Sequence, residues 1–156
     1  MRGDQRVIDG LNELLTLELT VINQYYVHSR MCQNWGYERL AAKFRADAMA
    51  EMKDAEEIID RILYFDGVPN VQRIGTVALG ETVPEQLELA ANAERAAVDL
   101  ITQSIKICDD AGDEGTREFL APKLPEEEAH LDWLEAQLRL IEQVGTENYL
   151  AQQIRE

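Results

Sequence analysis

The sequence predicts an all-α protein: a four-helix bundle with one long crossover between the second and third helices and a short fifth helix at the C-terminal end. Apolar residues recur every three or four positions through four long segments, which is the period of one helix face. Only 4 Pro and 9 Gly interrupt the 156 residues, and one segment, 67–82, lacks the helical period. We expect a single domain over 1–156, with the bundle at about 4–143 and the last helix at about 146–154.

The composition limits the classes of partner. The chain carries 15 Lys and Arg against 30 Asp and Glu, for a net charge of −15. This charge disfavours nucleic acid as a partner, because phosphate binding needs clustered cations. It suits a metal ion or a cationic partner, and it equally suits a protein that is kept in solution by its acidic surface.

Three further absences from the sequence point to a cytoplasmic protein. No apolar run reaches the length of about 18 residues that a membrane-spanning helix needs, so we expect no membrane partner. The first residues contain no apolar leader segment. Cys32 and Cys108 form no Cys-x-x-Cys pair, and free thiols are typical of a reducing compartment.

The first two predicted helices, at about 4–34 and 38–65, each carry an acid in the middle of the inward face. Glu18 interrupts the apolar row of the first helix, and Glu51 interrupts that of the second. Asp54 follows Glu51 by one helical turn, so both carboxylates lie on the same face. The remaining members of these rows are Ile8, Leu11, Leu15, Ile22 and Tyr25, then Phe44, Ala48, Ala55, Ile58, Ile62 and Phe65.

The segment 67–82 is predicted to be the crossover. It contains Pro69, Gly75 and Gly80, which disfavour a continuous helix. A helix of about 28 residues is about 42 Å long. About sixteen extended residues reach about 50 Å, enough to return along the whole bundle. We therefore expect the second and third helices to run parallel.

The third helix begins at a capping box, Thr82-x-x-Glu85, with Pro84 in its first turn. Its inward row is again interrupted near the middle by an acid, Glu94. The other members of this row are Leu87, Ala91, Val98, Ile101, Ile105 and Cys108.

The fourth helix carries Glu127 and, one turn later, His130 on its inward face. Pro122 and Pro125 fall in the same segment, and each lacks a backbone donor. The helix therefore either begins near Pro122 or is kinked just before Glu127. Its apolar row is Leu120, Leu124, Leu131, Leu134, Leu138 and Ile141, and after Gly145 the short last helix carries Tyr149, Leu150 and Ile154 on one face.

Four acids thus lie at matching depths, one on each long helix: Glu18, Glu51, Glu94 and Glu127. A single buried Glu is commonly satisfied by a Tyr, an Arg or a water molecule. Four carboxylates cannot all ionise in a low-dielectric interior without cations. A Glu from each of two helices, with Glu-x-x-His from the others, is the ligand pattern of di-iron carboxylate bundles. Carboxylate and imidazole ligands suit iron or manganese, and the absence of Cys ligands argues against a structural zinc.

Short stretches along the chain carry a resemblance to a known family: Met1-Arg2-Gly3-Asp4, Asn23-Gln24-Tyr25-Tyr26, Asn34-Trp35-Gly36, Arg61-Ile62-Leu63, Gly67-Val68-Pro69-Asn70, Glu127-x-x-His130, Asp132-Trp133-Leu134-Glu135 and Glu147-Asn148-Tyr149-Leu150. In these residues the sequence resembles the bacterioferritins, over essentially its whole length. The resemblance implies a ferritin-like fold and a hollow shell of twenty-four subunits that stores ferric mineral. It also implies haem b between subunit pairs and a reductant of the ferredoxin type.

The resemblance also implies roles for particular residues. Tyr25 matches a tyrosine beside the di-iron centre, and Met52 matches the methionine that each of two paired subunits donates to the haem iron. The residues themselves leave Met52 open, because Met49 and Met52 form an apolar spot that equally suits a dimer interface. The positions that match the ferroxidase ligands are Glu18, Glu51, Glu94, Glu127 and His130.

Position 54 departs from the family pattern, which has histidine where this chain has Asp54. An aspartate reaches less far than a histidine, and it adds a negative charge to the four glutamates. Two hypotheses follow. In the first, the chain is a working ferroxidase that uses dioxygen or peroxide, with Glu51 and Glu127 bridging two irons and Asp54 completing one of them. In the second, it is a haem-bearing structural or electron-transfer subunit with an impaired centre, in a mixed shell with a second bacterioferritin.

A third hypothesis is a DNA-protecting, starvation-type relative whose metal site lies between subunits. The acids within one subunit, the C-terminal helix and the absence of a basic tail argue against it.

Overall fold

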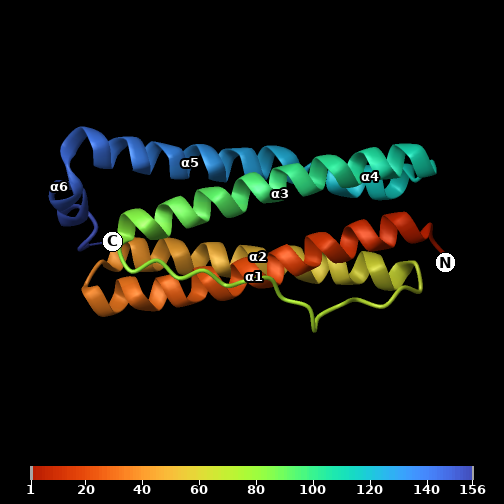
Figure 1. Cartoon of the computed structure of the whole chain (residues 1–156), viewed down its shortest axis with the longest axis horizontal. Helices are drawn as coiled ribbons and strands as arrows, with labels where there is room; N and C mark the ends of the chain where they lie inside the picture. The colour runs from red at the N-terminus through yellow and green to blue at the C-terminus, as the bar shows by residue number, and fades with distance from the viewer. Residues whose placement is uncertain (1, 156) are drawn as a thin grey trace.

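The computed structural model describes residues 2–155, and these residues form helices and connecting segments without a strand (Figure 1). Met1, the first residue of one family-like stretch, lies outside them, as does Glu156. The helices are α1 (Gln5–Trp35), α2 (Glu38–Tyr64), α3 (Val83–Ala111), α4 (Glu114–Leu120), α5 (Lys123–Val144) and α6 (Thr146–Ala151).

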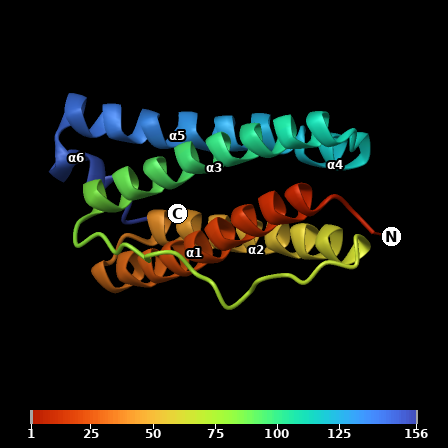
Figure 2. The same cartoon turned by 45° about the vertical axis from the view of Figure 1, so that its right-hand side comes forward.

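The long helices form the predicted four-helix bundle. Figure 1 and Figure 2 show α1 beside α2 as one pair, with α3 beside α4 and α5 as the other. Helix α1 also packs against α3, which joins the two pairs. The segment after α2 runs back along α1, so α2 and α3 point in the same direction (Figure 1). The predicted fold class and the predicted parallel direction of these helices are therefore confirmed.

Caps set the helix ends where the sequence predicted them. Thr82 accepts a hydrogen bond from the Glu85 N–H at 3.3 Å and so begins α3. Gly36 and Gly112 end α1 and α3 in the left-handed conformation, with φ of 87° and 69°. That conformation is accessible to glycine without the steric cost other residues carry.

The fourth predicted helix is divided at Pro122. Helix α4 ends at Leu120, and α5 begins at Lys123 with Pro122 as its N-cap. Of the two alternatives, a new helix beginning near Pro122 is therefore the correct one. Pro125 lies in the first turn of α5, where a missing N–H costs no helical hydrogen bond.

The last helix differs from the sequence expectation. We expected it to reach about residue 154, with Ile154 on its apolar face, but α6 ends at Ala151 and Ile154 is 52% exposed. Tyr149 is buried, and its hydroxyl donates to Gln137 at 2.8 Å. A helix of six residues is thus enough to dock this end of the chain on α5.

Helix α1 holds the crossover in place along its length. Three of its side chains, spaced eight residues apart, each accept a hydrogen bond from a crossover backbone N–H: Asn12 from Asn70 at 2.8 Å, Thr20 from Gly75 at 2.8 Å and His28 from Gly80 at 3.0 Å. Eight residues are about two helical turns, so these side chains lie on one face. These hydrogen bonds therefore hold the crossover against α1.

The apolar interior consists of two clusters that follow each other along the bundle axis. One contains Leu11, Leu15, Ile58, Ile62, Ile101 and Leu120, and the other contains Tyr25, Leu40, Phe44, Leu87 and Leu134. Along each long inward row, the acid lies between a member of one cluster and a member of the other. The four acids thus form a polar layer between the two apolar clusters.

No helix in the described range 2–155 is long and apolar enough to cross a membrane.

Candidate metal centre

The polar layer brings the four predicted acids together in the interior. Glu18 is 4% exposed, Glu51 6%, Glu94 1% and Glu127 6%. One oxygen each of Glu18, Glu94 and Glu127 has no hydrogen-bond partner among the described residues. Buried carboxylate oxygens without partners are costly unless a proton or a cation neutralises them.

Two groups of possible ligands share Glu51. The first, here called the His130 site, consists of Glu51, Glu94 and His130; the second, the Asp54 site, consists of Glu18, Glu51 and Asp54. In each group, one ligand atom from every residue lies within 4.8 Å of the others. A carboxylate common to both groups is suited to bridging two metal ions, and oxygen and imidazole donors fit iron or manganese.

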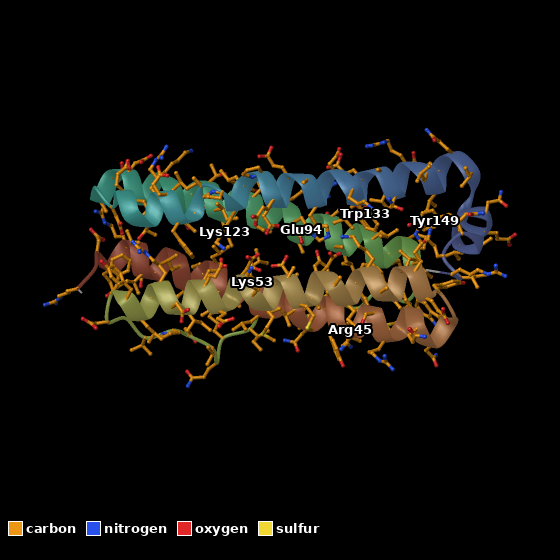
Figure 3. The ribbon with its side chains drawn as sticks, turned by 180° about the vertical axis from the view of Figure 1, so that it is seen from behind. Arg45, Lys53, Glu94, Lys123, Trp133 and Tyr149 are labelled. Carbon is orange, nitrogen blue, oxygen red and sulfur yellow. The ribbon has the colours of Figure 1, made fainter. Side chains whose placement is uncertain are left out.

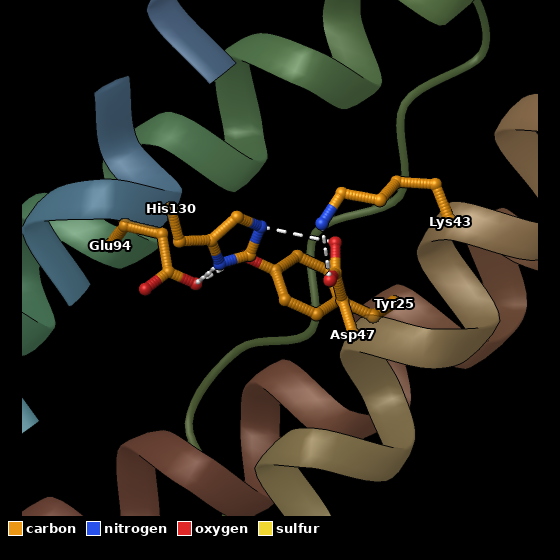
Figure 4. Close-up of polar contacts among 5 residues, drawn as sticks. All are labelled: Tyr25, Lys43, Asp47, Glu94 and His130. Atoms are coloured by element: carbon orange, nitrogen blue, oxygen red, sulfur yellow. Dashed lines mark hydrogen bonds and ion pairs between the residues drawn. The ribbon is translucent and has the colours of Figure 1, made fainter. Parts of the chain in front are cut away.

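A chain of polar contacts positions the ligands of the His130 site (Figure 4). Glu94 Oε1 accepts a hydrogen bond from the Tyr25 hydroxyl at 2.5 Å and lies 3.2 Å from His130 Nδ1. On the other side of the ring, His130 Nε2 lies 3.0 Å from Asp47 Oδ2. Asp47 in turn pairs with Lys43 at 2.8 Å. Tyr25 and Asp47 therefore fix Glu94 and His130 from opposite sides.

The electrostatics of this chain divide the carboxyl groups into protonated and ionised ones. Burial, with the neighbouring Glu94, raises the pKa of Glu127 to about 11 and that of Glu51 well above its usual value. Burial alone would also raise the pKa of Glu94, but hydrogen bonds with His130 and Glu127 lower it. Without metal, Glu127 therefore holds a proton and Glu94 is the ionised partner.

His130 is cationic in this arrangement. Burial by itself would lower its pKa, but the carboxylates of Asp47 and Glu94 raise it to about 9. A metal ion must displace this proton in order to bind the ring.

The Asp54 site is in contact with the ammonium group of a lysine. Lys123, the first residue of α5, has its Nζ 3.4 Å from Asp54 Oδ1 and 2.9 Å from Glu57 Oε2. Burial raises the pKa of Asp54 above its usual value, although Lys123 opposes this effect. Asp54 thus lies close enough to Glu18 and Glu51 to act as a ligand, but it also has an ammonium partner.

Comparisons with known proteins identify the family of this chain. Residues 8–144 match the family described as Ferritin-like domain. The chain is 45% identical to the bacterioferritin of Mycobacterium bovis over 152 residues, covering 97% of this chain and 96% of the relative. The chain belongs to the bacterioferritin family. The bacterioferritins of Brucella melitensis and Streptomyces coelicolor are each 40% identical to it, covering 96% and 97% of this chain and 92% and 90% of theirs.

Met52, whose role as a haem ligand stays a prediction, lies outside the candidate metal centre. Although it follows Glu51 in the chain, it is 50% exposed, and Met49 one turn earlier is 46% exposed. On the same surface the Arg45 guanidinium lies 6.0 Å from the centre of the Tyr26 ring. Both thioethers are therefore accessible from outside the subunit.

Two residues of this candidate centre, Asp47 and Lys123, were missed from the sequence. Asp47 precedes Glu51 by one turn, and Lys123 precedes Glu127 by one turn, so each shares a helix face with a predicted ligand. This spacing of one turn from a predicted ligand was the signal in the sequence that could have identified them. It is weak, because charged residues at such positions are commonly solvated.

Proposed function

We propose that this chain is an iron-storage subunit of a twenty-four-subunit cytoplasmic shell. It oxidises ferrous iron at the buried carboxylate–histidine centre and passes ferric iron to a mineral in the cavity. The observation that carries this proposal is the polar layer itself, in which four acids, one from each long helix, are buried. Three of them, Glu18, Glu51 and Glu94, form two ligand groups with His130 and Asp54, and Glu51 is common to both; Glu127 is buried in the same layer but belongs to neither group. Membership of the bacterioferritin family supports the same function.

In this proposal ferrous iron is the substrate, and dioxygen or peroxide is the oxidant that accepts its electrons. Glu51 would bridge two ions because it belongs to both ligand groups, and Glu127 is the second candidate bridge. Glu94 and His130 would complete one position. The protons that Glu51 and Glu127 hold without metal are released when cations replace them.

The test is the initial rate of ferrous oxidation after rapid mixing of apoprotein, Fe²⁺ and dioxygen. We expect Glu94→Gln to lower this rate by at least about tenfold, since even residues that only support a ligand commonly change metal affinity by about that much. Glu88→Gln is the matched control, because Glu88 lies on the same helix and its side chain is 56% exposed. Equal rates for Glu94→Gln and the wild type would refute the proposed site.

A second function is favoured by the exposed Met52 and by the Asp54–Lys123 contact. In it, the chain is a haem-bearing structural or electron-transfer subunit with an impaired centre. It works in a mixed shell beside a second bacterioferritin and receives electrons from a ferredoxin-type reductant. Asp54→His separates the two functions: an increase in the initial ferrous oxidation rate supports impairment, and an unchanged rate supports a working centre.

A further inference from the structure

Lys123 is an unusual residue for the interior of this bundle. Its side chain is only 9% exposed, and in Figure 3 it lies between the two helix pairs. Burial alone would lower the pKa of Lys123, but the carboxylates of Glu57 and Asp54 raise it, so the ammonium keeps its charge. A buried charge of this kind is stable only beside its counter-charges.

The position of the ammonium distinguishes the two ligand groups. Among the described residues, the ion pairs of Lys123 are with Asp54 and Glu57. Asp54 belongs to the Asp54 site alone, whereas Glu94 and His130 belong to the His130 site alone. Glu57 belongs to neither site, and its side chain is 43% exposed to solvent. The ammonium therefore lies between this half-exposed carboxylate and the Asp54 site.

Helix geometry keeps the ammonium there. Lys123 is the first residue of α5, directly after Pro122, and from this fixed backbone position its side chain reaches across to Asp54 on α2. Its Nζ also lies 4.9 Å from the centre of the Phe119 ring. An exposed Lys–Asp pair contributes little and is readily exchanged. This pair is enclosed, and moving the ammonium away would leave Asp54 without its partner.

We propose that the Lys123 ammonium is a built-in cation that takes the place of the second metal ion. The chain then binds one divalent cation tightly, at Glu51, Glu94 and His130, and a second one weakly, at Glu18, Glu51 and Asp54. This inference rests on the proposed metal centre. Its physical basis is that an ammonium in contact with Asp54 repels a divalent ion at the same oxygens and already supplies part of the positive charge the acids need.

The test is an anaerobic titration of the metal-free protein with Co²⁺, followed by calorimetry and by the visible absorption of bound cobalt. For the wild type we expect one tight equivalent per chain and a second that binds at least about tenfold more weakly. Lys123→Met removes the charge and keeps the length, and it should tighten the second equivalent by at least about tenfold. With Mn²⁺, the same variant should gain the electron paramagnetic resonance signal of a coupled pair of ions.

Lys53→Met is the matched control, since Lys53 adjoins Asp54 in the chain but is exposed. It should leave the second affinity unchanged. Lys123→Gln is a second variant that keeps a hydrogen-bond donor, in case Lys123→Met does not fold. Two equally tight equivalents in the wild type would overturn the inference while leaving the metal centre intact. An unchanged second affinity in both Lys123 variants would do the same, and no binding to any variant would overturn the metal centre as well.

Discussion

At the scale of single residues, Asp47 controls the charge state of His130 without belonging to either ligand group. Its carboxylate lies on the opposite side of the ring from Glu94, and Lys43 holds it in place. A carboxylate beside an imidazole stabilises the protonated ring and fixes its orientation. The protonation of His130 therefore depends on two acids, one a candidate ligand and the other a support.

This dependence predicts the effect of Asp47→Asn. We expect the pKa of His130 in the metal-free protein to fall from about 9 toward its ordinary value of about 6.5, because the charged hydrogen-bond partner is lost. Nuclear magnetic resonance titration can follow it directly, since the chain contains only 2 His. Because the pKa of His130 is higher in the folded than in the unfolded state, the protonated ring stabilises the folded protein. This contribution is complete below the unfolded-state pKa of about 6.5 and is lost as the pH rises through about 9. Asp47→Asn should therefore destabilise the protein more at about pH 6 than at about pH 10.

Asp132→Asn provides the comparison, because Asp132 lies on the same helix as His130 and is exposed. It should leave the titration of His130 unchanged. If Asp47→Asn also left it unchanged, Asp47 would not be the residue that holds the ring in its cationic form.

At the scale of elements, the crossover depends on a buried neutral histidine of α1. His28 is fully buried, and its Nε2 accepts the Gly80 N–H, so the ring must be uncharged at that nitrogen. Burial lowers the pKa of His28 to about 4. Because the pKa of His28 is lower in the folded than in the unfolded state, the neutral ring stabilises the folded protein above the unfolded-state pKa of about 6.5. This contribution is lost as the pH falls toward about 4.

We therefore expect the free energy of unfolding to decrease by about 2 kcal/mol from this residue alone between about pH 7.5 and pH 5. His28→Gln keeps an acceptor for the Gly80 N–H and cannot titrate. In urea denaturation followed by circular dichroism, it should remove most of this pH dependence. If His28→Gln had the same pH dependence of unfolding as the wild type, protonation of His28 would not be what destabilises the folded protein at low pH.

The end of the crossover is also tightly packed. A Cβ added at Gly80 would lie 2.7 Å from the Gln86 backbone nitrogen, a distance at which the backbone itself must move. We expect Gly80→Ala to destabilise the protein by about 1–3 kcal/mol, the usual range for forcing extra volume into a packed site. Gly75→Ala is a suitable comparison, because its nearest neighbour is the Thr20 hydroxyl at 3.2 Å. Thermal unfolding of both variants measures the difference, and equal midpoints would contradict the prediction.

The sequence predicted most of these elements, because each rests on local chemistry. The apolar rows, the Thr82 capping box and the glycines at the helix ends are all visible in the sequence, and so was the place of each acid between apolar neighbours. The Lys123–Asp54 contact joins residues 69 positions apart in the chain. No helical period or motif brings these two side chains together, and only the packing of α2 against α5 does so. The role of the acids as metal ligands stays a prediction.

At the scale of the whole molecule, the candidate metal centre and the predicted haem ligand lie on different faces of α2. Glu51 faces the bundle interior, whereas Met52 faces outward and is half exposed. An outward-facing thioether is available to a second subunit. In a twofold symmetric pair the same surface of each chain meets the other, so that two Met52 thioethers can approach one iron.

This arrangement predicts that Met52→Leu separates haem binding from assembly. Leucine keeps an apolar side chain of similar volume, so subunit pairing should persist, but it has no sulfur to donate to iron. We expect the purified protein to elute at the same size as the wild type and to lose at least about nine-tenths of its haem absorption after reconstitution with haem. Met49→Leu, one turn away on the same surface, should retain that absorption. Loss of haem in both variants would point to a general apolar surface, and its retention in Met52→Leu would show that another residue is the ligand.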